Sequence, residues 1–303
     1  RTVRPSIAKR AVVMFCADNG VVAQGVTQCG QEVTATVTEN MGRGKSTVCL
    51  MAKHIGMDSF PVDIGVARDV EGERILRRKI RYGTADMTKE PAMTREEAVR
   101  ALETGIQMAE WCAAQGYRLV CGGEMGIGNT TTSAAVTAVL TGANVCDVTG
   151  RGAGLSSEGL ERKVRAIETA LKLHHPDPND PVDILHKVGG LDIAGMAGFY
   201  LGAAACGLPV VLDGVISCAA ALIAVRLCPA VRDYLIAAHQ SAEPAGRLLL
   251  EALGYTPFIS AGMRLGEGTG AVAAVAMIDL VLAAYDGMPS FDEAGIEAYQ
   301  PLT

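Results

Sequence analysis

The sequence has 303 residues, of which 49% are hydrophobic, 20% charged and 4% aromatic, with 35 glycines and a formal net charge of -6. This composition excludes a disordered chain, and the acidic balance offers no broad surface for nucleic acid or an anionic membrane. Nine cysteines without a C-x-x-C pair indicate neither a disulfide framework nor a zinc site, so we expect a cytoplasmic enzyme.

Five short apolar runs each end at, or surround, a polar side chain. They are residues 11–16 before Asp18, 60–64 around Asp63, 118–123 before Glu124, 209–212 before Asp213, and 235–238 before His239. Continuous apolar runs are typical of strands buried on both faces. Segments of helical period lie between them, at residues 32–54, 95–114, 191–206 and 215–225. We therefore expect an α/β fold with a parallel sheet covered by helices on both faces, and polar groups gathered at its carboxyl edge.

The two ends of the chain carry expectations about its extent. The first strand begins close to residue 11 with no element before it, so an N-terminal segment is expected to be missing from the sequence. The whole chain, 1–303, is expected to be one unit, with an α/β core over about 10–260 and a C-terminal helical part over about 268–303 that packs with the missing segment. We expect no apolar run long enough to span a bilayer and no signal peptide.

Residues 42–46 read Gly-Arg-Gly-Lys-Ser, which resembles the end of a nucleotide-binding P-loop. That motif needs a glycine five residues before Gly44, where this chain has Glu39, and it follows a strand, whereas this stretch lies in a segment of helical period. A kinase or ATPase is therefore excluded, and Lys45 is expected at the surface.

Two glycine-rich loops suggest an anion site. Residues 121–132 follow a strand and open a helix, so backbone N–H groups and threonine hydroxyls could hold a phosphate there. Residues 149–156 lead into a polar helix from which Lys163 could reach the same anion. An ordinary turn with surface charges would explain either loop alone, but two loops and a lysine fit a phosphate better.

Glu267 lies among three glycines in residues 263–270, before an apolar helix over 271–285 that is expected to be buried. A glutamate at a helix N-terminus is often only a favourable partner of the helix dipole. Glu124 beside the first glycine loop adds a second acid, and no set of metal ligands accompanies them. This combination suggests displacement at the anomeric carbon of a sugar phosphate, in which a carboxylate takes the proton of the nucleophile.

Several ordered stretches, spread over about residues 12–295, resemble the nicotinate-nucleotide:dimethylbenzimidazole phosphoribosyltransferase family. The stretches are 17–21, 79–84, 90–94, 123–131, 150–155, 189–194, 212–214, 239–244 and 263–270. The resemblance implies a Rossmann-like sheet with a small helical subdomain from the chain ends, a homodimer, and neither cofactor nor metal. The implied reaction moves the ribose 5-phosphate of nicotinate mononucleotide to an aromatic acceptor of the benzimidazole type, giving an α-ribotide and free nicotinate.

The same resemblance assigns site residues by position. Glu267 is the expected general base, and Glu124 is the second expected catalytic acid. The expected nucleotide- and phosphate-binding residues are Gly126, Gly128, Asn129, Thr130, Gly152, Gly154, Lys163, Asp213 and Ser241. The acceptor pocket is expected to be lined by Thr27, Thr36, Met125 and Leu265.

Two departures from the family pattern leave the acceptor open. Thr36 stands where the family has Gln, and Asn19 stands where many relatives have His. Phenols, other benzimidazoles and purines are therefore alternative acceptors, and phenols would suit one subunit of a heterodimer with a paralogue. A non-catalytic partner subunit is the alternative from outside the enzymes, although Glu124, Lys163 and Glu267 argue against it.

Overall fold

The computed structural model describes residues 5–297, 299 and 300. Within these residues, parallel strands form one sheet in the order β3-β2-β1-β4-β5-β6. The strands are Arg10–Ala17 (β1), Asp58–Gly65 (β2), Leu76–Arg77 (β3), Leu119–Met125 (β4), Val210–Leu212 (β5) and Leu235–Ala237 (β6).

The helices connect the strands and cover both faces of the sheet. They are Glu32–Gly42 (α1), Thr47–His54 (α2), Arg95–Ala114 (α3), Asn129–Thr141 (α4), Val145–Val148 (α5), Ser157–His174 (α6), Pro181–Val188 (α7), Leu191–Ala205 (α8), Val215–Leu227 (α9), Ala245–Leu253 (α10) and Thr269–Gly287 (α11). Short 3-10 helices cover Gly20–Gln24 and Pro229–Tyr234. The predicted parallel α/β sheet is confirmed.

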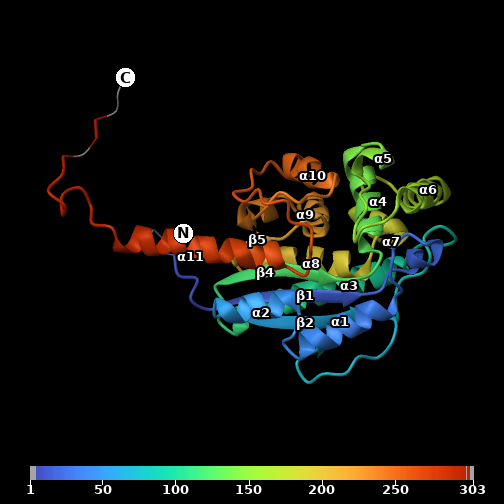
Figure 1. The fold of residues 1–303 in the computed structure, drawn as a ribbon, viewed down its shortest axis with the longest axis horizontal. Coiled ribbons are helices and arrows are strands. Elements are labelled where there is room, and N and C mark those ends of the chain that lie inside the picture. The colour runs from blue at the N-terminus through green and yellow to red at the C-terminus, as the bar shows by residue number, and fades with distance from the viewer. Residues whose placement is uncertain (1–4, 298, 301–303) are drawn as a thin grey trace.

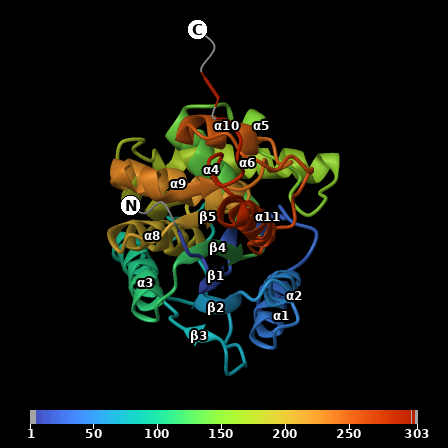
Figure 2. The same cartoon turned by 90° about the vertical axis from the view of Figure 1, so that its left-hand side faces the viewer.

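Strand β1 shows why both faces need a cover. Val13 and Phe15 pack into one hydrophobic cluster and Val12 and Met14 into the other, because successive side chains of a strand point to opposite faces. Figure 2 shows α3 and α8 on one side of the sheet and α1, α2 and α11 on the other. All-parallel sheets are stable in this arrangement because apolar side chains leave water on both faces.

The strand order places a ligand site. The chain builds β1, β2 and β3 outward in one direction and then adds β4, β5 and β6 on the other side of β1. In such doubly wound sheets, ligands bind outside the carboxyl ends of the strands, close to where the order reverses. Glu124 lies near the end of β4, and Asp213 directly follows β5, so both acids stand at that edge.

Two elements differ from the sequence expectation. The predicted helix over 32–54 is two helices, because Gly44 takes a φ of +69° and the Ser46 side chain caps α2 by accepting a hydrogen bond from Cys49 N. Strand β3 was not predicted, since a two-residue strand has no periodicity to detect. The P-loop interpretation stays excluded because residues 42–46 follow a helix, and Lys45 is exposed as expected.

Helix α11 is buried only at its beginning, so the expectation of a buried helix is wrong for its second half. Ala271 and Val275 are fully buried in the core, whereas Leu280 and Val281 are 73% and 66% exposed. By length and composition, α11 could also cross a membrane, contrary to the expectation, although a helix partly embedded in a folded core meets the same criteria. Figure 1 shows that α11 begins beside the sheet and extends away from the rest of the fold.

Candidate active site

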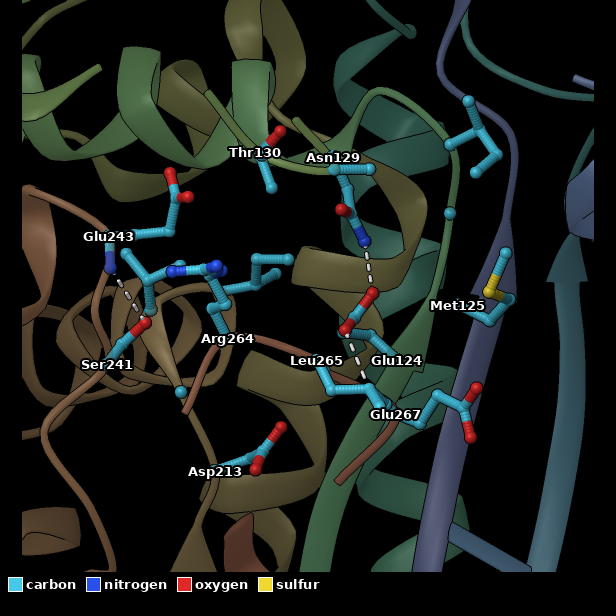
Figure 3. A pocket seen from close by; sticks show the side chains of 18 of the residues that line it. Glu124, Met125, Asn129, Thr130, Asp213, Ser241, Glu243, Arg264, Leu265 and Glu267 are labelled. Carbon is cyan, nitrogen blue, oxygen red and sulfur yellow. Dashed lines mark hydrogen bonds between the residues drawn. The ribbon is translucent and has the colours of Figure 1, made fainter. Parts of the chain in front are cut away.

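A cavity of about 260 Å³ lies at the carboxyl edge of the sheet, between the starts of α4 and α11. Figure 3 shows side chains from several loops pointing into it. The sequence-predicted residues that line it are Thr27, Glu124, Met125, Gly126, Gly128, Asn129, Thr130, Gly152, Asp213, Ser241, Leu265 and Glu267. The fold therefore gathers most of the predicted site residues, from distant parts of the chain, around one space.

Three predicted residues lie elsewhere. Lys163 stands behind the lining, and Gly154 is exposed beside Gln28, whose side-chain amide donates to its carbonyl. Thr36 is exposed, and its hydroxyl donates to Glu32 O at 3.0 Å. Thr36, predicted for the acceptor pocket, thus lies outside the lining of this cavity, and Val37, the next residue of α1, lines it instead. Adjacent helical residues point about 100° apart, which explains the difference.

The candidate phosphate end is built around Lys163. Its side chain is fully buried, and its Nζ donates to Thr130 Oγ1 at 2.8 Å and to Gly150 O at 3.0 Å. Burial lowers the Lys163 pKa to about 8, and the charge of Glu243 opposes that decrease. The ammonium group thus joins the two glycine-rich loops and places positive charge directly behind the first turn of α4.

The turn from β4 into α4 depends on glycine. A Cβ on Gly126 would lie 2.4 Å from Ala17 O, so only glycine fits against β1 there. Gly128 has a φ of +94° and precedes the first residue of α4, Asn129. Asn129 N and Thr131 N donate to Gly126 O and Gly128 O, and the partial positive charge of the helix N-terminus makes this turn suited to an anion.

Glu124 is held in a buried network of acids. Asn129 donates its side-chain amide to Glu124 Oε2 and, at 2.9 Å, to Asp192 Oδ2. Burial, followed by the charge of Asp192, raises the Glu124 pKa to about 8. Burial also raises the Asp192 pKa, to about 6. At neutral pH the protonated form of Glu124 is therefore favoured, which leaves it able to donate a proton.

Glu267 occupies an unusual backbone conformation. Its φ is +64°, between Gly266 at +89° and Gly268 at +99°. The Glu267 N–H donates to Glu124 Oε1 at 3.2 Å, and its own carboxylate accepts from Val48 N, at the start of α2, at 3.1 Å. Non-glycine residues rarely adopt this region unless the surroundings hold them there, and such residues concentrate at functional sites.

Asp213 fixes the start of the helix that follows Glu267. Its carboxylate accepts hydrogen bonds from Gly268 N at 3.1 Å, Gly270 N at 2.7 Å and Ala271 N at 3.2 Å. His239 Nε2 lies 3.6 Å from Asp213 Oδ1. Burial lowers the His239 pKa, but the hydrogen bond and charge of Asp213 outweigh it and leave that pKa raised. Asp213 lines the cavity as predicted, yet its carboxylate oxygens already accept hydrogen bonds from backbone N–H groups at the start of α11.

Three charged residues of the lining, Arg151, Glu243 and Arg264, were not assigned from sequence. Arg264 and Glu243 both line the cavity, and Figure 3 shows their side chains on the same side of it as Ser241. Both belong to stretches that carried the resemblance, so a signal was present, but nothing in the sequence fixed where their side chains point. Asp18, expected at the same edge, lies outside the lining, and its carboxylate accepts from Ala67 N at 2.7 Å.

The cavity therefore combines two chemical ends. One end offers a buried lysine, a hydroxyl and helix N–H groups, which suit a phosphate. The other end offers the carboxyl groups of Glu124 and Glu267 beside the apolar side chains of Val37, Met125 and Leu265, which suit proton transfer to or from an aromatic molecule.

Comparisons with known proteins identify similar phosphoribosyltransferases. A family model described as phosphoribosyltransferase matches residues 1–296. The chain is 48% identical over 299 residues to a nicotinate-nucleotide–dimethylbenzimidazole phosphoribosyltransferase of Acetivibrio thermocellus, covering 99% of this chain and 85% of that protein. A protein of the same description from Geobacter metallireducens is 48% identical over 294 residues, covering 97% and 83%. The crystal structure of CobT from Thermus thermophilus superposes with a TM-score of 0.92 at 41% identity, covering 97% of this chain and 88% of that one.

Proposed function

This chain belongs to the nicotinate-nucleotide–dimethylbenzimidazole phosphoribosyltransferase family, and from that premise we propose that it transfers ribose 5-phosphate from nicotinate mononucleotide to a benzimidazole. It is a pentosyltransferase, and the products of this reaction are an α-ribotide and free nicotinate. The observation that carries the proposal is that Glu124 and Glu267 line the same cavity, whose other end is built on Lys163; the backbone N–H of Glu267 donates to Glu124 Oε1 at 3.2 Å.

In the proposed reaction, the imine nitrogen of the benzimidazole attacks the anomeric carbon of the ribose. The bond from that carbon to the pyridinium nitrogen breaks, and its electron pair returns to the ring, so nicotinate leaves without needing a proton. The remaining N–H of the benzimidazolium gives its proton to a carboxylate. Glu267 fits this role as a carboxylate at the cavity wall, while burial favours the protonated form of Glu124 at neutral pH.

The donor is proposed to bind with its phosphate at the other end of the cavity. Lys163, Thr130 and the first turn of α4 supply positive charge and N–H or O–H donors there. Gly126, Gly128, Asn129, Gly152 and Ser241 complete the proposed nucleotide site, and Gly154 contributes by shaping the second loop. Asp213 contributes through α11, because its carboxylate holds the backbone that carries Glu267.

The acceptor is proposed to lie against Thr27, Val37, Met125 and Leu265 at the end near Glu267. Thr36 motivated the phenol alternative, and its exposed position outside the lining removes that motive. Benzimidazole is therefore the acceptor class that we favour. A flat apolar wall binds an aromatic ring through burial of its surface, and the polar groups then fix its orientation.

For the assembly, we propose a single transferase unit that forms a cytoplasmic homodimer, without contact to nucleic acid or membrane. The exposed apolar side chains of Met277, Leu280 and Val281 on the second half of α11 support an interface with another chain. Size-exclusion chromatography with light scattering should give twice the monomer mass. A monomer at micromolar concentration would contradict this proposal, and activity only with an added paralogue would favour the heterodimer.

The proposed activity is tested with purified protein, nicotinate mononucleotide and 5,6-dimethylbenzimidazole, followed by mass spectrometry of the products. An α-ribotide and an equal amount of nicotinate are expected. Parallel reactions with phenol, p-cresol and adenine measure the selectivity for the acceptor. Transfer to phenols but not to benzimidazoles would overturn the acceptor class, and no transfer to any acceptor by the folded protein would favour a non-catalytic subunit.

A further inference from the structure

Most charged side chains around the cavity already have partners within the protein. Glu124 accepts from Asn129 and from Glu267 N, and Asp213 accepts from three backbone amides of α11. Arg151 donates to Leu155 O at 2.8 Å and to Ser157 Oγ at 3.1 Å. These contacts hold the groups in place within the protein.

Arg264 differs from the other cations. Its guanidinium makes no hydrogen bond or ion pair with any described residue, although the residue lines the cavity. In Figure 3 its side chain lies between Ser241 and Leu265. Its five N–H donors are therefore available, and an arginine fork is suited to bind a carboxylate through two parallel hydrogen bonds.

The loop that carries Arg264 is anchored on both sides. Ala242 N donates to Met263 O at 3.0 Å on one side, and Glu267 N donates to Glu124 Oε1 at 3.2 Å on the other. These hydrogen bonds hold the backbone of the loop on either side of Arg264, which lies three residues before Glu267. The backbone of Arg264 therefore belongs to the loop that carries Glu267, while its side chain reaches across the cavity towards Ser241 (Figure 3).

The proposed donor carries two anionic groups, the phosphate and the carboxylate on the pyridine ring. Lys163 and the start of α4 supply positive charge for the phosphate. The ring is attached to the carbon at which the acceptor attacks, so its carboxylate also belongs near the reacting end. Among the described lining residues, Arg264 is the arginine whose side chain has no partner within the protein.

We propose that Arg264 binds the carboxylate of the nicotinate ring and so selects the acid over the corresponding amide. This inference rests on the proposed function, because it assumes a nicotinate nucleotide as donor. The contact is made to the intact donor and to released nicotinate alike. It therefore contributes to binding of the donor and little to the chemical step.

The test is calorimetric titration of the protein and of Arg264→Met with nicotinate, nicotinamide and inorganic phosphate. The Kd for nicotinate should rise about 10–100-fold in Arg264→Met, as expected when a charge-assisted pair of hydrogen bonds is lost. The Kd values for nicotinamide and phosphate should change by less than about twofold, because neither ligand engages this contact. In turnover assays the donor KM should rise while kcat stays near the wild-type value.

Two further variants make the result specific. Arg264→Lys keeps the charge but loses the fork, so it should restore only part of the affinity for nicotinate. Arg247→Met removes an exposed arginine of α10 that pairs with Glu251 outside the cavity, and it should behave as wild type.

Several results would overturn the inference. They are an unchanged nicotinate Kd in Arg264→Met, an equal rise in the Kd for phosphate, and wild-type protein that binds nicotinate no more tightly than nicotinamide. Failure of the proposed function itself would look different. The wild type would then transfer no ribose phosphate from nicotinate mononucleotide, whatever the binding titrations of Arg264→Met show.

Discussion

The two ends of the cavity hold charge in different ways. At the phosphate end, the buried Lys163 belongs to the regular helix α6 and has partners on both glycine-rich loops, where the left-handed positions are glycines. At the reacting end, Glu267 stands in a left-handed conformation and Glu124 has a raised pKa. The first end is built to bind an anion without rearranging. The second end holds Glu267 in an unfavourable backbone conformation and keeps Glu124 buried, and both cost free energy. Substitutions at the two ends should therefore affect different steps, binding at the first and catalysis at the second.

The largest effect is expected at the reacting end, from Glu267→Gln. The amide oxygen can still accept from Val48 N, so the fold should be kept, but the side chain can no longer take a proton. We expect kcat to fall by about 10²–10⁴-fold, with the donor KM nearly unchanged. Steady-state kinetics of the variant and the wild type would check this. A folded variant with full turnover would show that another group is the base.

At the phosphate end, Lys163→Met should weaken donor binding more than it slows the chemical step. The variant removes the cation that contacts Thr130 and Gly150, and we expect the donor KM to rise about 10–100-fold. Lys172→Met, on the exposed side of the same helix, is the matched control. Equal donor KM values in the two variants would remove Lys163 from the phosphate site.

The backbone around Glu267 can be tested with two glycines of one loop. A Cβ on Gly266 would lie 2.6 Å from Glu124 Oε1, whereas a Cβ on Gly262 would meet nothing within 4 Å; their φ values are +89° and +62°. Both alanine variants should lose roughly 1 kcal/mol of stability from the left-handed backbone. Only Gly266→Ala should also lower kcat/KM, by about tenfold, since it displaces the two acids. An equal decrease in kcat/KM for both variants would contradict the role of the close approach between Gly266 and Glu124.

The raised pKa of Glu124 makes stability depend on pH. The folded state holds this proton up to about pH 8, whereas the unfolded chain releases it near the ordinary value of 4.5. Its contribution to stability is therefore fully present below pH 4.5 and is lost as pH rises towards 8. The Tm of the wild type should fall relative to that of Glu124→Gln by on the order of 5 °C between about pH 5 and pH 8. Parallel Tm curves for the two proteins would show that Glu124 ionises normally.

The sequence was sufficient for features that repeat along the chain. Continuous apolar runs predicted the main strands, and the acids after them, Glu124 and Asp213, indicated the edge that holds the cavity. Features set by the direction of a single side chain could not be predicted. Composition does not tell which half of α11 is buried against the sheet. No local sequence pattern shows that backbone N–H groups of that helix donate to the Asp213 carboxylate, or that the Arg264 side chain has no partner.

Thr36 illustrates this limit and gives the smallest predicted effect. Its hydroxyl is bonded to Glu32 O on the outside of α1, whereas Val37 faces the cavity. Thr36→Ala should therefore leave the acceptor KM within about twofold, while Val37→Ala should raise it about fivefold through loss of apolar contact with the ring. Benzimidazole titrations of both variants would measure the difference. A larger change in acceptor affinity for Thr36→Ala than for Val37→Ala would show that polar contacts select the acceptor. A larger change for Val37→Ala would show that the apolar wall at the reacting end selects it.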